Sequence, residues 1–138
     1  MVRRIDNGHA LAAAAVLLGG GFGMFAWARS LPQFCAAVAV WTVGEIVYSV
    51  TAPALVSDLS TASLRGRYQG VWGASVGAAA VTGPAIGGLL ISDLGVAWLW
   101  RMCIGLGLGI AALHWALAGA YRRAPKPGDQ VAAHAMGS

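Results

Sequence analysis

The sequence predicts an all-α integral membrane protein with about four transmembrane helices. Of its 138 residues, 58% are hydrophobic and only 10% are charged, and most charges fall at the ends of apolar runs. The mean hydropathy is +0.68. A water-soluble domain of this length cannot cover its surface with so few charges. Since a membrane helix uses about 20 residues plus a connector, the length fits about four spans.

Four apolar runs make up the predicted transmembrane segment, residues 1–121. The first run stops at Arg29, and the second is expected to bend at Pro53, because proline lacks the amide donor that a helix interior needs. A polar connector separates the second run from the third, and a short turn separates the third from the fourth. The predicted helices cover residues 9–28, 33–57, 68–91 and 96–121.

The two ends of the chain are interpreted separately. Arg3 and Arg4 precede the first apolar run, as in a secretory signal, but this run is longer than the roughly 7 to 15 residues of such signals. Residues 122–138 combine proline, lysine, glycine and alanine without an apolar period. We predict that they form a disordered cytoplasmic tail.

Basic residues predict the orientation. If the helices alternate in direction, seven basic residues fall on one side and two, Arg29 and Arg101, on the other. The bias predicts a multi-pass protein of the cell (plasma) membrane with both termini in the cytoplasm. The seven residues are Arg3, Arg4, Arg65, Arg67, Arg122, Arg123 and Lys126.

Several other function classes are disfavoured. The basic residues form no patch with interleaved aromatics, so nucleic acid is not an expected partner. Cys35 and Cys103 have no further Cys or His at ligand spacing, so we expect no metal site, and we interpret both as small buried hydrophobic residues. No nucleophile, base and orienting group occur together outside lipid, so neither an enzyme nor a cofactor is expected. The expected partner is the lipid bilayer.

Glu45 is the most informative residue, because a carboxylate at the centre of a span costs about 2.5–3.5 kcal/mol on insertion scales. Removal from water favours the protonated form of a carboxyl group, so such a residue can exchange a proton near neutral pH. One helical turn on either side lie Trp41, Thr42, Tyr48 and Ser49. An acid flanked by rings suits lipophilic cations. We predict a proton and substrate site at these five residues; the alternative is a structural Glu45 bonded to a neighbouring helix.

The third predicted helix contains small residues at spacings that allow backbones to approach closely. Gly73 and Gly77 have GxxxG spacing, and a Gly-Pro-x-x-Gly-Gly run adds a bend at Pro84. The same spacing occurs in two other pairs, Gly19 with Gly23 and Gly105 with Gly109. At both pairs we expect ordinary helix packing. The predicted interface residues of the third helix are Gly73, Gly77, Gly83, Pro84, Gly87 and Gly88.

The connector before the third helix contains Arg65, Gly66 and Arg67. Two readings remain open for the arginines. They either determine topology alone, or they pair with acids and helix ends as a transporter changes conformation.

Four segments together resemble the last third of a major facilitator superfamily transporter, most closely the drug and proton antiporters of that superfamily. The segments are Gly44-Glu45-Ile46-Val47, Val56-Ser57-Asp58-Leu59, Leu64-Arg65-Gly66-Arg67-Tyr68-Gln69-Gly70 and Gly83-Pro84-Ala85-Ile86-Gly87-Gly88. The resemblance covers nearly the whole chain apart from the tail. It implies a partial fold of this superfamily, corresponding to about helices nine to twelve.

The resemblance implies a transporter fragment that takes part in proton-coupled efflux of small hydrophobic or cationic compounds. Members of the superfamily have two six-helix halves, so the expected partners are a small-molecule substrate and either the missing helices or a second copy of the chain. The second predicted helix would line the cavity, the third would face the opposite half, and the first and fourth would be peripheral. Two alternatives stay open: a self-contained four-helix small multidrug exporter acting as a dimer, and a non-transporting membrane subunit or remnant.

Overall fold

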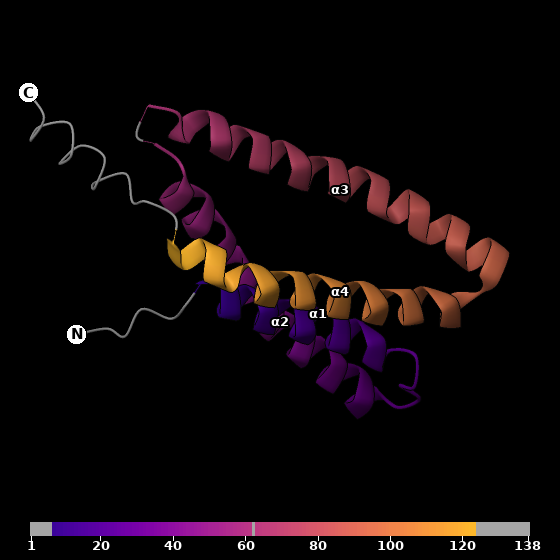
Figure 1. Cartoon of the computed structure of the whole chain (residues 1–138). Helices are drawn as coiled ribbons and strands as arrows, with labels where there is room; N and C mark the ends of the chain where they lie inside the picture. Colours follow the sequence, from indigo (N-terminus) through magenta and orange to yellow (C-terminus); the bar gives the residue numbers. More distant parts are fainter. Residues whose placement is uncertain (1–6, 62, 124–138) are drawn as a thin grey trace, which may run out of the picture.

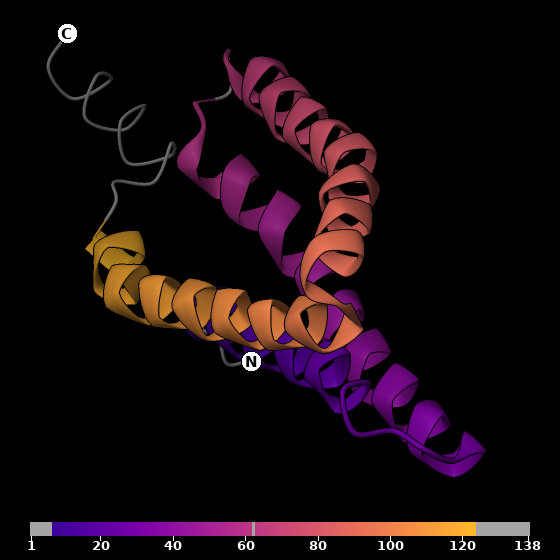
Figure 2. The same cartoon turned by 90° about the vertical axis from the view of Figure 1, so that its right-hand side faces the viewer.

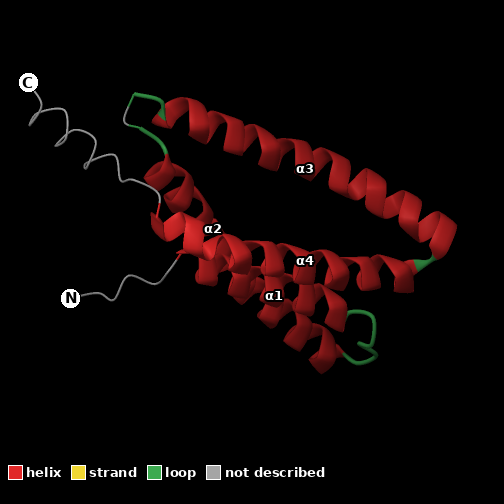
Figure 3. Ribbon diagram, viewed as in Figure 1, coloured by secondary structure: helices red, strands yellow, loops and turns green. Residues whose placement is uncertain are grey.

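In a computed structural model, the chain forms four α-helices joined by short connections (Figure 1 and Figure 3). The structure describes residues 7–61 and 63–123, with side chains as far as Ala120. Within these residues there is no strand, which confirms the predicted all-α class. The helices are α1 (Asn7–Met24), α2 (Leu31–Leu59), α3 (Arg65–Leu94) and α4 (Val96–Arg123).

Local hydrogen bonds move two helix ends from the predicted positions. α1 ends at Met24 rather than at residue 28, because the amides of Phe25 and Ala26 bond three residues back, to Phe22 and Gly23, in a tight turn. α2 starts at Leu31 rather than at residue 33, because the Gln33 Oε1 accepts bonds from the backbone amides just before the helix, at 2.7 Å and 3.2 Å. These bonds satisfy donors that a helix start otherwise leaves open.

The later helices are longer than predicted. α3 includes Arg65, which we had assigned to the connector, and stops before Gly95, whose φ of 86° favours glycine. α4 continues to Arg123, so the predicted tail begins inside a helix. The rest of the predicted tail, together with Arg3, Arg4 and Lys126, lies outside the described residues.

Three of the described helices, α2, α3 and α4, are long and apolar enough to cross a membrane. α1 has only 18 residues, and its first turn contains Asn7 and His9. The four predicted helices are therefore present, and three of them meet the requirement for a span by length and composition. A chain with three such helices is a multi-pass membrane protein.

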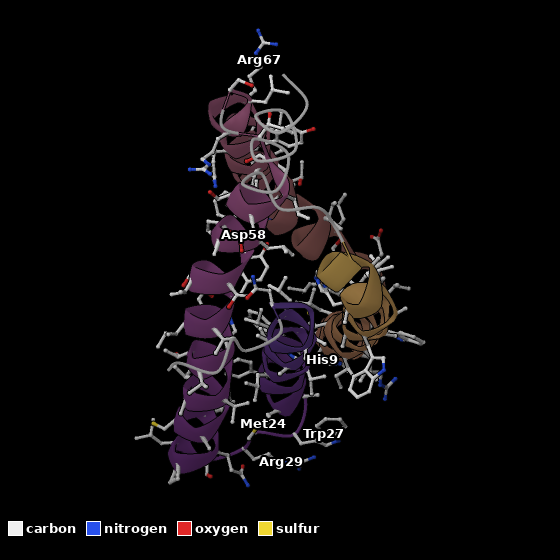
Figure 4. All side chains as sticks on the ribbon, turned by 60° about the vertical axis from the view of Figure 1, so that its left-hand side comes forward. His9, Met24, Trp27, Arg29, Asp58 and Arg67 are labelled. Carbon is white, nitrogen blue, oxygen red and sulfur yellow. The ribbon has the colours of Figure 1, made fainter. Side chains whose placement is uncertain are left out.

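The helices alternate in direction, as the count of basic residues on two sides assumed. One end of the molecule contains the start of α1, the end of α4 and the α2–α3 connection. The other two connections lie at the opposite end (Figure 1). Figure 4 places Arg67 at one extreme of the view, with Trp27 and Arg29 toward the other. Arg67 and Arg29 thus lie at opposite ends of the molecule.

α1 packs along both α2 and α4. Against α4 it approaches closely because glycines meet: a Cβ added to Gly19 would lie 2.8 Å from the Gly107 Cα. A Cβ added to Gly23 would collide with the side chain of Ile104. Backbones can come this near only where side chains are absent, so these glycines set the α1–α4 crossing.

Glycines also determine the contact between α1 and α2. A Cβ on Gly21 would lie 2.6 Å from the Trp41 backbone nitrogen, and a Cβ on Gly44 would lie 2.9 Å from the Leu17 Cβ. Both glycines are buried. Within this chain, α1 therefore packs between α2 and α4; its peripheral place in a whole transporter stays a prediction.

An aromatic cluster holds the three helices together near the α1–α2 connection. Phe22 of α1 lies 5.5 Å from Trp41 of α2 and 6.3 Å from Trp100 of α4, measured between ring centroids. Phe25 adds contacts with Trp100 and Phe34, at 5.2 Å and 5.9 Å. Such ring pairs each add about 0.5–1.5 kcal/mol beyond the area that they bury.

α3 stands apart from this three-helix unit. None of its described residues is buried, and it approaches the other helices only near its ends (Figure 2). Near its start, the Gln69 Nε2 donates a hydrogen bond to the Pro53 carbonyl of α2, at 3.0 Å. Pro53 lies inside α2, where it removes one backbone donor. The bond therefore ties the start of α3 to the proline-containing turn of α2.

We predict opposite effects for alanine at two adjacent glycines. Gly19→Ala should lower the free energy of unfolding by about 1–3 kcal/mol, because its methyl group would collide with Gly107. Gly20 has nothing within 4 Å, so Gly20→Ala should be neutral or stabilising by up to about 1 kcal/mol through helix propensity. Equilibrium unfolding in mixed micelles measures both, and equal effects would refute the close α1–α4 contact.

We also predict that Gln69→Met, which keeps length but removes the donor, loosens α3. The loss should be about 0.5–1.5 kcal/mol, and spin labels on Val43 of α2 and Ala79 of α3 should report a broader distance distribution. Ser75→Ala is the control, because the Ser75 hydroxyl bonds only to Trp72 within α3. An unchanged distribution in Gln69→Met would show that the bond does not position α3.

Candidate functional site

Glu45 is the middle residue of α2. Its side chain is exposed, whereas its neighbour Gly44 is buried against Leu17 and Leu18 of α1. Successive helical residues are turned by about 100°, so the burial of Gly44 directs Glu45 away from the α1 interface. The helix that α1 packs against therefore presents its central acid on an uncovered flank.

Two of the predicted polar neighbours share this flank. Thr42 and Ser49 are exposed like Glu45, and the three positions fall within about 60° of one another around the helix axis. The Ser49 hydroxyl donates to the Ile46 carbonyl at 3.0 Å. We refer to Thr42, Glu45 and Ser49 as the polar flank of α2.

The two predicted aromatic neighbours lie nearer to α1. Trp41 is half-buried and contacts Phe22, so it belongs to the aromatic cluster as well. Tyr48 is 37% exposed, at the margin between the two sides. The five residues of the predicted proton and substrate site thus form two parts: an exposed polar part, and an aromatic part that borders the α1 contact.

The motif arginines lie in the first turn of α3. Arg65 and Arg67 are exposed, and Arg67 projects away from the bundle (Figure 4). Positive charge is electrostatically unfavourable at a helix N-terminus, so helix stability does not account for these arginines. Gly66 between them has no atom within 4 Å of an added Cβ.

The small residues of α3 have almost no partner among the described residues. Gly87 has one neighbour, the Leu99 Cδ1 at 3.7 Å from an added Cβ. Pro84 is exposed. The positions with nothing within 4 Å include Gly73, Gly77, Gly83 and Gly88. A face suited to close helix packing is therefore left uncovered in this part of the chain.

Other chemistry finds little support in the described residues. They contain no group of three or more His, Cys, Asp or Glu residues that could hold a metal ion. Cys103 is half-buried, but Cys35 is exposed, which corrects the expectation that both are buried. Two surface grooves, between α1 and α4 and beside the α1–α2 turn, have no Glu45 in their lining.

Sequence reasoning found the acid but missed what positions it. Gly44 carries the signal, because a glycine beside a mid-helix acid leaves room for a neighbouring helix on one side. The aromatic cluster was also missed, since its rings come from three helices. Chemically, the polar flank offers one carboxylate and two hydroxyl groups, which together can bind a proton or a cation.

Comparison with known proteins identifies the family. The model of the Major Facilitator Superfamily matches residues 1–136. The MFS-type transporter Rv1877 of Mycobacterium tuberculosis is 44% identical over 87 residues, which cover 62% of this chain and 12% of the relative. The multidrug transporter protein MdtP of Bacillus subtilis is 38% identical over 71 residues, or 51% of this chain and 13% of the relative.

A third relative, the MFS-type transporter YttB of Bacillus subtilis, is 29% identical over 75 residues, or 54% of this chain and 19% of the relative. The matched segments thus span less than a fifth of these relatives, and no solved structure matches. The family match covers nearly every residue, including α2 with its acid and α3 with its glycines. The chain belongs to the Major Facilitator Superfamily.

Proposed function

We propose that the chain is part of a proton-coupled exporter of small hydrophobic or cationic compounds, and that the polar flank of α2 binds the proton and the substrate. Glu45 is the residue that alternates between the two. In this scheme the carboxylate pairs with a cation when ionised and releases it when protonated, so proton entry drives substrate departure.

The observation that carries this proposal is the exposed carboxylate at the middle of a helix able to span a membrane. A charge at that depth is unfavourable in lipid, and such residues usually face a pathway or a cavity. Trp41 and Tyr48 border the acid with ring faces that attract cations. The name of one relative, a multidrug transporter, agrees with a hydrophobic or cationic substrate.

We further propose that the glycine face of α3 packs against other helices of the same transporter, either in a longer chain or in a second copy. Open space over Gly73, Gly77 and Gly83 supports this. Arg65 and Arg67 then lie on the cytoplasmic side of the plasma membrane with both termini, as the distribution of basic residues favours. Their unfavourable place at a helix start supports a role in conformational change or topology.

Binding of a lipophilic cation tests the role of Glu45. Ethidium should bind the purified chain more tightly at pH 8 than at an acidic pH, because a proton and the cation compete for the same carboxylate. Glu45→Gln should weaken binding about tenfold at pH 8, as expected for the loss of one ion pair in a partly desolvated site, and should remove the pH dependence. Fluorescence titration in detergent measures both.

Asp93→Asn is the matched control, since Asp93 is an exposed acid near the end of α3. It should bind ethidium as the wild-type chain does, with the same pH dependence. Equal binding by the wild-type chain and Glu45→Gln at both pH values would contradict the proposal and favour a structural Glu45.

A further inference from the structure

A groove on the outer side of the bundle plays no part in the proposed transport site. It lies between α1 and α4 and has a volume of about 380 Å³. Its lining is almost wholly apolar, with small side chains at its floor: Ala12 and Ala111 are buried. The lining residues are His9, Ala12, Ala13 and Val16 of α1 with Leu108, Ala111, Ala112 and Trp115 of α4.

The glycine contact explains why this groove exists. α1 and α4 touch backbone to backbone at Gly19 and Gly107. From there toward the start of α1, alanines line the interface and leave its outer edge unfilled. The stretch from His9 to Val16 is about 10 Å long at 1.5 Å per residue, which is two thirds of the roughly 15 Å that one leaflet contributes to the hydrocarbon core.

One end of the groove has a different character. His9 and Trp115 meet edge to face there, with ring centroids 5.2 Å apart, and Figure 4 shows His9 on α1. Rings with a polar edge favour the membrane–water interface. The sequence has two basic residues, Arg122 and Arg123, two turns after Trp115, where α4 ends.

We propose that this groove binds an anionic phospholipid, with an acyl chain along the alanine floor and the headgroup beyond His9 and Trp115. Lipid surrounds a membrane-spanning helix, and an apolar groove of this length fits a single chain. The basic composition of the sequence where α4 ends suits an anionic headgroup. The lipid site lies on the opposite side of α1 from the α2 contact, and it does not depend on the identity of the transported substrate.

Spin-labelled lipids test the acyl-chain part. The chain is reconstituted in phosphatidylcholine vesicles that contain spin-labelled phosphatidylglycerol, and the motionally restricted fraction of the label is measured. Ala112→Phe and Ala13→Phe should each fill the groove and reduce this fraction. Ala116→Phe is the control, because Ala116 is also exposed on α4 but does not line the groove; it should leave the fraction unchanged. Circular dichroism verifies that each variant keeps its helices.

A separate variant tests the predicted binding of the anionic headgroup. The wild-type chain should restrict labelled phosphatidylglycerol more than labelled phosphatidylcholine. Changing Arg122 and Arg123 to Gln should reduce this preference by about two- to fivefold, as expected for removing basic residues near an anionic surface. Restriction of phosphatidylcholine should stay the same.

Four results would overturn the proposal. The first is an unchanged restricted fraction in both groove variants, and the second is an equal loss in Ala116→Phe. The third is a change of sedimentation mass in Ala112→Phe, which would show that a second copy of the chain occupies the groove. Displacement of the labelled lipid by ethidium in Glu45→Gln would likewise assign the groove to a hydrophobic compound.

Discussion

The close approach of α1 to its two neighbours is the constraint on which the rest of the structure depends. Between helices in lipid there is little hydrophobic driving force, so backbones must come near enough for dispersion and weak polar contacts to accumulate. Gly19 and Gly107 allow this on one side of α1, and Gly21 and Gly44 allow it on the other. The aromatic cluster around Phe22 then fixes the end where the three helices meet.

The proposed function rests on what this three-helix unit leaves uncovered. Because Gly44 faces α1, Glu45 is directed to the free flank of α2. α3 makes few contacts with this unit, and most of its glycines have open space around them. The chain therefore presents an acid and a small-residue face, and both are suited to further helices of a transporter.

The sequence predicted the helices well and their partners poorly. Apolar runs and flanking charges located all four helices, since these signals are local, while the ends moved wherever a side-chain cap such as Gln33 intervened. GxxxG spacing correctly marked Gly19 and Gly23 as packing residues, but on α4 it marked Gly105, which faces open space, whereas Gly107 makes the contact. Spacing identifies faces that permit close approach; only the crossing of two helices decides which face is used.

α1 covers one side of α2 and leaves the polar flank uncovered, so we expect water to reach this flank. Single cysteines on α2, in a chain whose two native cysteines are replaced by serine, test it through their reaction with a water-soluble maleimide in lipid vesicles. Thiols at Thr42, Glu45 and Ser49 should react readily, and thiols at the buried positions Ala37 and Ala52 should not. Equal reactivity at all five positions, or none at the polar flank, would contradict the account.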